Sequence, residues 1–297
     1  MATLRTPAPI RELQRALYLR AKRERSFRAY ALYDKVYRPD ILAHAYAVAK
    51  ANGGAPGPDG CTFKEIEADG REGLLEELRK ELETKTYRPG PVRRVYIPKL
   101  NGGERPLGIP NIRDRVVQTA VKLLLEPLFE ADFEPDSYGF RPKRSAHDAL
   151  DAIREALQTG MCWVIDADVT AYFDTIPHDR LMKTVAERVV DSAMLALVKR
   201  FLEAPVVDAR EGGRPQRPRQ GTPQGGVISP ARERVPTLGG SELPHARAPR
   251  RVARPARSLR GRFGPPRAAV SGPRTGLAHT RAGTARSGAA PAEDARP

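Results

Sequence analysis

The sequence has few cysteines and no long apolar segment. Its two cysteines, Cys61 and Cys162, lie far apart and form no ligand pair. This argues against a disulfide scaffold or a zinc site and fits a reducing compartment. No segment approaches the roughly 20 apolar residues that a membrane helix needs, and the charged N-terminus has no apolar signal core. We therefore expect a soluble, cytoplasmic protein.

Lysine is missing from the last part of the chain. Residues 231–297 hold fourteen arginines and four acidic residues, a net charge of +10, and no isoleucine, asparagine, glutamine or tyrosine. Such a segment cannot bury enough apolar area to offset chain entropy, so we predict a disordered basic tail. Two interpretations stay open: an RNA-binding arm, or the product of a frameshift in a GC-rich gene, which the abrupt change at Ala231 favours.

The chain is strongly basic, with a net charge of +15 and a pI of about 10.1. This balance indicates a polyanionic partner. Residues 1–230 carry only +5 of the charge, so a binding surface there depends on where cations cluster. One cluster, at residues 22–28, is either a solvated helix face or a face that contacts phosphates.

Periodicity and turn-forming residues predict the order of the first elements. Apolar residues at helical spacing indicate a helical region at residues 1–52, and Gly and Pro indicate a loop at residues 53–60. A helix at residues 74–82 and a hairpin with strands at 92–97 and 106–110 follow. A hairpin with cations beside a Gly-rich turn is either ordinary surface or a grip for a triphosphate.

The second half of the chain is predicted to be mainly helical. Asn111 can cap a helix with an apolar stripe over residues 116–128. Ser145 and Asp148 form a capping box, and the helix that follows is expected to turn its apolar residues inward: Ala149, Ile153 and Leu157. Two more helices are expected within residues 178–202, the first beginning near His178.

The segment at residues 163–174 combines a strand-forming run with acidic residues. Residues 163–165 are strand-forming and predict a buried strand, followed by three acids: Asp166, Asp168 and Asp174. A buried strand does not tolerate an unpaired carboxylate, because desolvation costs several kcal/mol or more. From spacing alone such an Asp caps the next helix, pairs with a cation or binds a metal ion.

The loop at residues 135–144 combines aromatic and cationic side chains, which suit a nucleic-acid strand through stacking and phosphate contacts. Its candidate nucleic-acid-binding residues are Tyr138, Phe140, Arg141, Lys143 and Arg144.

Four motifs then occur in a fixed order. They are Arg-Pro-Leu-Gly-Ile-Pro at 105–110, Tyr-Gly-Phe-Arg-Pro at 138–142, Asp-Val-x-x-Tyr-Phe-Asp at 168–174 and Gly-Thr-Pro-Gln-Gly-Gly-Val-Ile-Ser-Pro at 221–230. Together they resemble the reverse-transcriptase domain of bacterial group II intron-encoded reverse transcriptase/maturases. The resemblance covers about residues 33–230, so we expect that domain at residues 53–230, after the N-terminal helical region.

The resemblance implies an α+β right-hand polymerase fold, with fingers and a partial palm built on an antiparallel sheet. It implies an RNA-directed DNA polymerase that extends a DNA primer with dNTPs on an RNA template. Asp168, with the Val169 carbonyl nearby, matches the catalytic Asp that binds Mg²⁺. The nucleotide-binding positions that match are Lys99 and Arg105 at the triphosphate, Phe173 under the sugar, and Gln224. Two cations about 4 Å apart can neutralise the attacking and leaving oxygens of phosphoryl transfer.

The sequence departs from the family after Pro230. Family members continue with an apolar helix and a hairpin that carries an aromatic-Ala-Asp-Asp motif, but no Asp-Asp pair follows here. One Asp cannot hold two Mg²⁺ ions, so we expect the chain to be inactive alone. The incomplete palm sheet would expose apolar surface. Two alternatives stay open: a non-enzymatic intron RNA-binding fragment, or a reverse transcriptase of diversity-generating or defence type.

Overall fold

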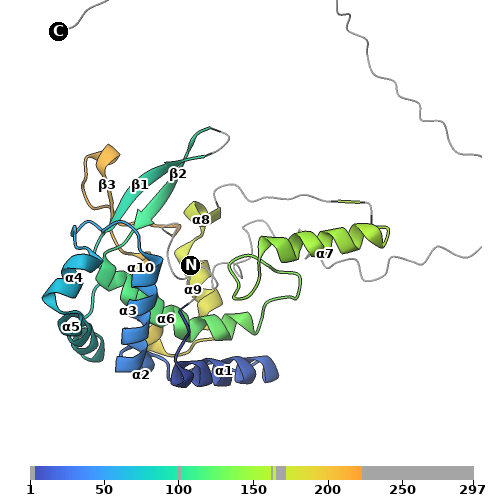
Figure 1. Ribbon diagram of the computed structural model, residues 1–297, viewed down its shortest axis with the longest axis horizontal. Coiled ribbons are helices and arrows are strands. Elements are labelled where there is room, and N and C mark those ends of the chain that lie inside the picture. Colours follow the sequence, from blue (N-terminus) through green and yellow to red (C-terminus); the bar gives the residue numbers. More distant parts are fainter. Residues whose placement is uncertain (1–3, 100–101, 162, 165–171, 223–297) are drawn as a thin grey trace, which may run out of the picture. The chain divides into compact units, whose positions relative to one another are not determined.

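The computed structural model describes residues 4–99, 102–161, 163–164 and 172–222. Predictions for Asp168, Val169, Gln224 and the tail at 231–297 lie outside these residues. The described part is α+β: helices surround an apolar core, and a small sheet lies beside them (Figure 1). None of the described helices is long and apolar enough to cross a membrane.

The core is built around α6, Ile112–Glu130. Its apolar residues recur at helical spacing, and Val117, Val121 and Leu124 are fully buried. Two N-terminal helices pack against it, α1 (Ala8–Arg23) and α3 (Pro39–Asn52). Burying one such side chain stabilises the fold by roughly 1.5–3 kcal/mol. The N-terminal helical region therefore shares its core with the predicted reverse-transcriptase domain.

Three shorter helices surround α3: α2 (Tyr33–Val36), α4 (Phe63–Asp69) and α5 (Arg71–Glu83). A capping box starts α4, because the Thr62 hydroxyl accepts from the Glu65 N–H, and the Glu65 carboxylate accepts from the Thr62 N–H at 2.8 Å. The inner face of α5 is apolar, with Leu78 and Leu82 fully buried in the same core as α3.

Asn111 is the N-cap residue of α6, as predicted, but its side chain does not cap the helix. Its side chain makes no capping hydrogen bond; instead Oδ1 accepts from the Asp59 N–H at 3.4 Å. The loop at 53–60 folds back onto the start of α6 and takes up this side chain. Arg93 also donates to the Pro56 carbonyl at 2.7 Å, so the Gly- and Pro-rich loop is tied to both α6 and the sheet.

The sheet contains β1 (Val92–Pro98), β2 (Glu104–Ile109) and β3 (Val206–Asp208), in the order β2-β1-β3. β1 and β2 form the predicted antiparallel hairpin, in which Arg94 pairs with Gly108. β3 pairs with β1 in parallel, so the described sheet is mixed and not purely antiparallel. A short 3-10 helix, η1 (Ala209–Glu211), follows β3.

Three helices lie in sequence between residue 171 and β3: α8 (Tyr172–Thr175), α9 (His178–Ala186) and α10 (Ser192–Leu202). The predicted start near His178 is confirmed. Asp191 caps α10 by accepting from the Ala193 and Met194 N–H groups at 3.1 Å. Helices α9 and α10 pack against each other, and their buried residues include Leu181, Val185 and Val198.

The expected inward face of α7 (Ala146–Gln158) is wrong. The capping box of Ser145 and Asp148 is present, so the helix forms where predicted, but none of its residues is buried. Ile153 is 54 % exposed and Leu157 is 49 % exposed. The helix has an apolar side, yet the described core forms without it.

The predicted buried strand is also not found at its first two positions. Trp163 is 99 % exposed, Val164 is 76 % exposed, and neither belongs to a strand. A strand needs a hydrogen-bonded neighbour, and among the described residues the sheet order ends at β2 and β3. Ile165 lies outside the described residues.

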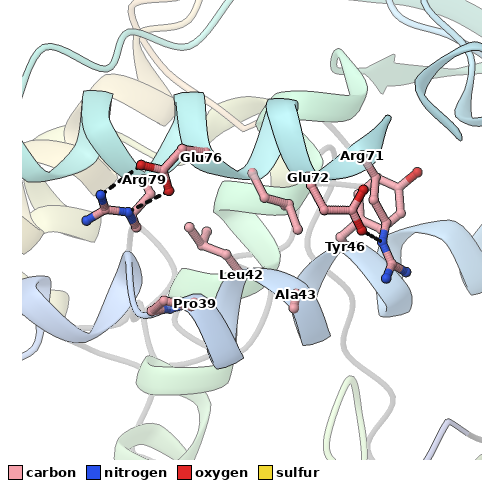
Figure 2. A pocket seen from close by; sticks show the side chains of 9 residues that line it. Pro39, Leu42, Ala43, Tyr46, Arg71, Glu72, Glu76 and Arg79 are labelled. Carbon is pink, nitrogen blue, oxygen red and sulfur yellow. Dashed lines mark hydrogen bonds and ion pairs between the residues drawn. The ribbon is translucent and has the colours of Figure 1, made fainter. Parts of the chain in front are cut away.

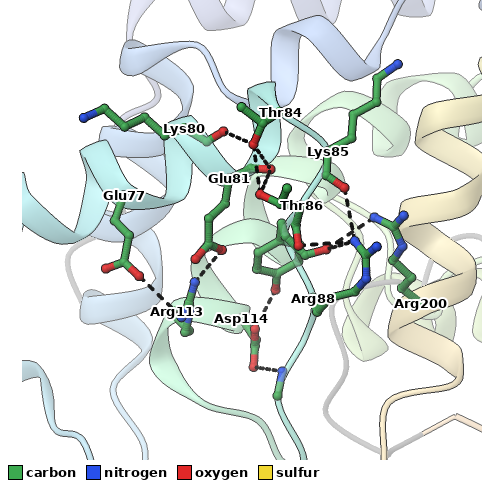
Figure 3. A network of polar contacts seen from close by, with 12 residues as sticks. Glu77, Lys80, Glu81, Thr84, Lys85, Thr86, Arg88, Arg113, Asp114 and Arg200 are labelled. Carbon is green, nitrogen blue, oxygen red and sulfur yellow. Dashed lines mark hydrogen bonds and ion pairs between the residues drawn. The ribbon is translucent and has the colours of Figure 1, made fainter.

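A buried polar network joins α5, the segment between α5 and β1, and α6 (Figure 3). Asp114 is 1 % exposed; its Oδ1 accepts from the Tyr87 hydroxyl at 2.5 Å and its Oδ2 from the Gly90 N–H at 3.0 Å. Beside it, Arg113 contacts the Glu81 carboxylate at 2.6 Å. Burial raises the pKa of Asp114, although both hydrogen bonds oppose the rise.

We expect Asp114→Asn to lower the free energy of unfolding by about 1–3 kcal/mol at pH 7. The amide NH₂ of asparagine would face either the Tyr87 hydroxyl or the Gly90 N–H, and that hydrogen bond to the side chain would be lost. The folded-state pKa of Asp114 lies above its unfolded value, so its favourable contribution is complete below the unfolded pKa. It is lost as the pH rises through the folded pKa. The deficit of Asp114→Asn should therefore grow from pH 7 toward pH 4, as measured by urea unfolding.

Exposed Asp151→Asn is the control, and its deficit should stay within about 0.5 kcal/mol. A deficit of Asp114→Asn that shrinks as the pH falls would show that the pKa of this buried carboxyl is lowered.

Candidate active site

Two motifs that lie about 45 residues apart in sequence meet in the structure. The Thr222 N–H donates to the Phe173 carbonyl at 2.8 Å, and the Gly221 N–H donates to the Ile176 carbonyl at 2.8 Å. Pro177 and Gln220 form an antiparallel bridge between the same segments. The motif around Phe173 and the motif that begins at Gly221 are therefore one hydrogen-bonded unit.

Gly221 is required at this junction for two reasons. Its φ of +76° is in the left-handed region that favours glycine, and an added Cβ would lie 2.5 Å from the Asp174 carbonyl oxygen. The Gly221 carbonyl in turn contacts Nε2 of His178 at 2.7 Å. His178 was predicted only as the start of a helix. Its ring also holds the junction, a role that the sequence did not indicate.

A cleft of about 270 Å³ lies between this junction and the hairpin. The hairpin contributes Arg94, Pro106 and Gly108, and the junction contributes Asp174 and Thr222, among others. This volume lies just below the range of about 300–1,000 Å³ that is usual for small-molecule sites. Thr222 is 4 % exposed, and its hydroxyl has no hydrogen-bond partner among the described residues.

The two faces of the hairpin have different neighbours. Side chains alternate along a strand, so the face of Arg94, Pro106 and Gly108 lines the cleft. Arg105 pairs with Ile97 in the register and belongs to the other face. Both Arg105 and Lys99 are exposed, Lys99 beside the turn. The cation in the cleft is thus Arg94, which the sequence did not single out because cations occupy both faces.

The hairpin is braced by the segment that follows β3. The Tyr96 hydroxyl donates to Asp208 Oδ2 at 2.5 Å, and this hydrogen bond lowers the pKa of Asp208. Arg210 lies over the Tyr96 ring, 4.0 Å from its centroid, and pairs with Glu104 at 2.5 Å. These contacts fix the orientation of the strand that carries Arg94.

The loop at residues 135–144 is held by Arg141, whose side chain is 6 % exposed. Its guanidinium contacts Glu130 at 2.7 Å and donates to the Glu134 and Ser137 carbonyls at 2.8 and 2.6 Å. We predicted Arg141 as a nucleic-acid contact. In the structure its guanidinium instead binds groups of the protein, because Glu130 on α6 provides a counter-charge within 2.7 Å.

The other predicted residues of this loop remain at its surface. Phe140 is 61 % exposed and touches the ring of Phe173, with centroids 6.0 Å apart. Arg144 lies over the Tyr138 ring at 5.4 Å, and Lys143 is exposed. The loop therefore adjoins the candidate site through Phe140.

The described residues do not form a metal site. No three His, Cys, Asp or Glu side chains among them come together in a way that could hold a metal ion. Asp174 is the carboxylate of the cleft, whereas Asp168 and Val169 lie outside the described residues. The described part of the cleft therefore contributes one carboxylate, that of Asp174.

A second cavity of about 280 Å³ lies between α3 and α5 (Figure 2). Its floor is apolar, with Leu42 and Ala43. The cations at its rim are already paired: Arg71 with Glu72 and Arg79 with Glu76, both at 2.8 Å. It contains none of the predicted site residues, so the cleft beside the hairpin is the better candidate.

Comparison with known proteins agrees with the motifs. The family described as reverse transcriptase (RNA-dependent DNA polymerase) matches residues 97–233. Protein YkfC of Escherichia coli is 42 % identical over 228 residues, which cover 74 % of this chain and 58 % of that protein. Group II intron-encoded protein LtrA of Lactococcus lactis is 39 % identical over 204 residues, covering 67 % of this chain and 32 % of that protein.

Structural similarity is weaker. One chain of the solved "Partial Cas6-RT-Cas1--Cas2 complex" superimposes with a TM-score of 0.43 at 20 % identity, covering 69 % of this chain and 34 % of the other. A likeness at this level carries no conclusion about function.

The cleft, the motifs and the family match define a reverse-transcriptase domain. The chain belongs to the group II intron-encoded reverse transcriptase/maturase family. It spans at most 58 % of the length of the relatives described above.

Proposed function

We propose that this chain is the fingers and partial palm of an RNA-directed DNA polymerase of the group II intron type. The whole enzyme would extend a DNA primer with dNTPs on an RNA template. The observation that carries the proposal is the hydrogen-bonded junction of Phe173 with Thr222. It joins the motif that begins at Asp168 to the motif that contains Gln224, beside a cationic hairpin.

The side chains around the cleft suit a deoxynucleoside triphosphate. Arg94 supplies a cation in the cleft, and guanidinium groups bind phosphate oxygens in a bidentate manner. We also assign Lys99 and Arg105 to the triphosphate; both are exposed on the same hairpin, with Arg105 on the face away from the cleft. Phe173 is half-buried next to Asp174, and we assign it the sugar-facing position. Gln224, two residues after Thr222, is assigned to the nucleotide.

Divalent metal is general to reverse transcriptases, and we assign Mg²⁺ to Asp168 and the Val169 carbonyl. When bound there, it would neutralise charge on the reacting phosphate oxygens. A complete two-metal site needs more carboxylates than Asp168 offers. Because no Asp-Asp pair follows residue 230, we propose that this chain alone does not polymerise.

Primer extension tests this proposal. The purified chain and Asp168→Asn are each incubated with Mg²⁺, dNTPs and a DNA primer annealed to an RNA template. We expect no extension by either protein, together with RNA binding that weakens steeply with salt. Extension that disappears in Asp168→Asn would overturn the inactivity and support the polymerase, whereas absence of RNA binding would count against the family role.

One observation favours a second function, RNA binding without catalysis. Arg141 anchors the loop at 135–144 to the protein, and the loop presents Tyr138 and Phe140 together with the cations Lys143 and Arg144. Aromatic side chains of this kind stack on nucleobases, and the cations contact phosphates. Lys143→Gln together with Arg144→Gln should reduce the salt dependence of RNA binding by about two phosphate contacts. Lys199→Gln, an exposed cation on α10, is the control.

A further inference from the structure

Phe140 occupies a position that suits neither its backbone nor its ring. Its φ of +51° lies in the left-handed region, which glycine or asparagine adopts at a lower cost than a bulky residue. Its side chain is 61 % exposed, so burial in the core does not explain a phenylalanine at this position either. A strained backbone that carries an exposed aromatic side chain indicates a role other than folding.

The ring of Phe140 contacts the ring of Phe173, which belongs to the next motif along the chain. The two centroids are 6.0 Å apart and the ring planes meet at 85°. This edge-to-face geometry is one that aromatic pairs favour. Because the preference depends on the angle as well as the distance, the contact constrains the orientation of the Phe173 ring.

Both partners of this contact are held by their own segments. Arg141, directly after Phe140, is anchored by its ion pair with Glu130 at 2.7 Å. The carbonyl of Phe173 accepts from the Thr222 N–H at 2.8 Å. These contacts fix the backbone of Phe173, but a fixed backbone still allows its side chain to change rotamer. The Phe140 ring restricts that change.

The Phe173 side chain is half-buried next to Asp174, which lines the cleft. With Phe173 assigned to the sugar of the nucleotide, its ring can reject a 2′-hydroxyl only if it does not turn aside. We propose that Phe140 is a positioning residue that holds the Phe173 ring in place and thereby sets the discrimination between deoxyribonucleotides and ribonucleotides. This inference rests on the proposed function and deepens it, because it assigns how the cleft selects its substrate class.

Equilibrium binding of dATP and ATP, which differ only in the 2′-hydroxyl, tests the proposal. The full chain is mixed with Mg²⁺ and a DNA primer annealed to an RNA template whose next base is uracil, and is titrated with each nucleotide. We expect dATP to bind roughly tenfold to a hundredfold more tightly than ATP. Phe140→Leu keeps an apolar side chain but loses the ring contact. It should reduce this ratio by about threefold or more through tighter binding of ATP.

Two further variants separate the ring contact from the backbone. Phe140→Tyr keeps an aromatic edge and should keep the ratio. Phe140→Gly removes the ring but relieves the left-handed backbone, so it should unfold at a urea concentration no lower than that of the unchanged chain. It should nevertheless reduce the ratio as Phe140→Leu does. Tyr30→Leu changes a 71 % exposed aromatic residue outside the cleft and is the control that should leave the ratio unchanged.

The possible failures are distinguishable. A ratio that Phe140→Leu leaves unchanged would overturn the role of Phe140 and leave the proposed function standing. Equal weakening of dATP and ATP binding would do the same, because Phe140 would then be a general contact. Binding of neither nucleotide by the unchanged chain would overturn the proposed function and, with it, the discrimination assigned to Phe140.

Discussion

Replacing Arg188 by methionine is expected to lower the free energy of unfolding by about 3–5 kcal/mol. The Arg188 side chain is 5 % exposed and forms an ion pair with Asp132, to which its Nε also donates at 2.7 Å. Its Nη1 donates to the carbonyls of Glu24, Arg25 and Phe27 at 3.3, 2.8 and 2.9 Å. Methionine fills the space but leaves a largely buried carboxylate without this counter-charge. Urea unfolding followed by circular dichroism measures the loss.

Two further variants make this prediction specific. Arg79→Met removes the ion pairs of a half-exposed arginine with Glu76 and Glu83 on the same helix and should cost at most about 1 kcal/mol. Arg188→Lys keeps the charge but not the planar fork, so its cost should lie between those of the other two. If Arg188→Met cost no more than Arg79→Met, another contact would have to hold residues 24–29 against α6.

Gly221→Ala is expected to have the second large effect, a loss of about 2–4 kcal/mol of stability together with loss of nucleotide binding. The left-handed backbone at φ +76° costs a non-glycine residue about 1–3 kcal/mol. The new Cβ would also overlap the Asp174 carbonyl oxygen at 2.5 Å. Relief of that overlap must separate the Phe173 segment from Thr222, the junction that forms the cleft. Urea unfolding and equilibrium binding of a dNTP measure the two losses.

Gly212→Ala is the matched control. Gly212 has a φ of +79°, but nothing lies within 4 Å of its added Cβ. It should lose only the cost of the left-handed backbone, about 1–2 kcal/mol, and keep any nucleotide binding. Equal losses in the two variants would mean that the close approach to Asp174 contributes nothing, and the junction would then tolerate side chains at Gly221.

Local signals in the sequence predicted local structure well. The capping box at Ser145, the stripe of α6 and the hairpin of β1 and β2 are all confirmed, because each depends on residues within a few positions of one another. Asn111 shows the limit of such signals. Asn111 stands at the N-cap position, but its side chain accepts a hydrogen bond from the Asp59 N–H in the loop at 53–60. The residues near Asn111 in sequence do not indicate that this loop reaches it.

The direction in which a face points was harder to predict. For α7 the period was correct, yet the expected burial of Ile153 and Leu157 is wrong. Periodicity shows that a helix has an apolar side, but burial depends on whether another segment reaches that side. The same reason explains Trp163 and Val164, since a strand is buried only when neighbouring strands and a covering layer are present.

The sequence by itself determined the family, because four ordered motifs name it without any distance being known. It also determined the order of most helices and of the β1–β2 hairpin, through periods and caps that are local in the chain. The tertiary structure alone decided that Arg94 and Thr222 share a cleft, that His178 holds Gly221, and that Arg141 pairs with Glu130. These contacts join residues as far as 128 positions apart, and which of many polar groups meet over such spans depends on how the core packs.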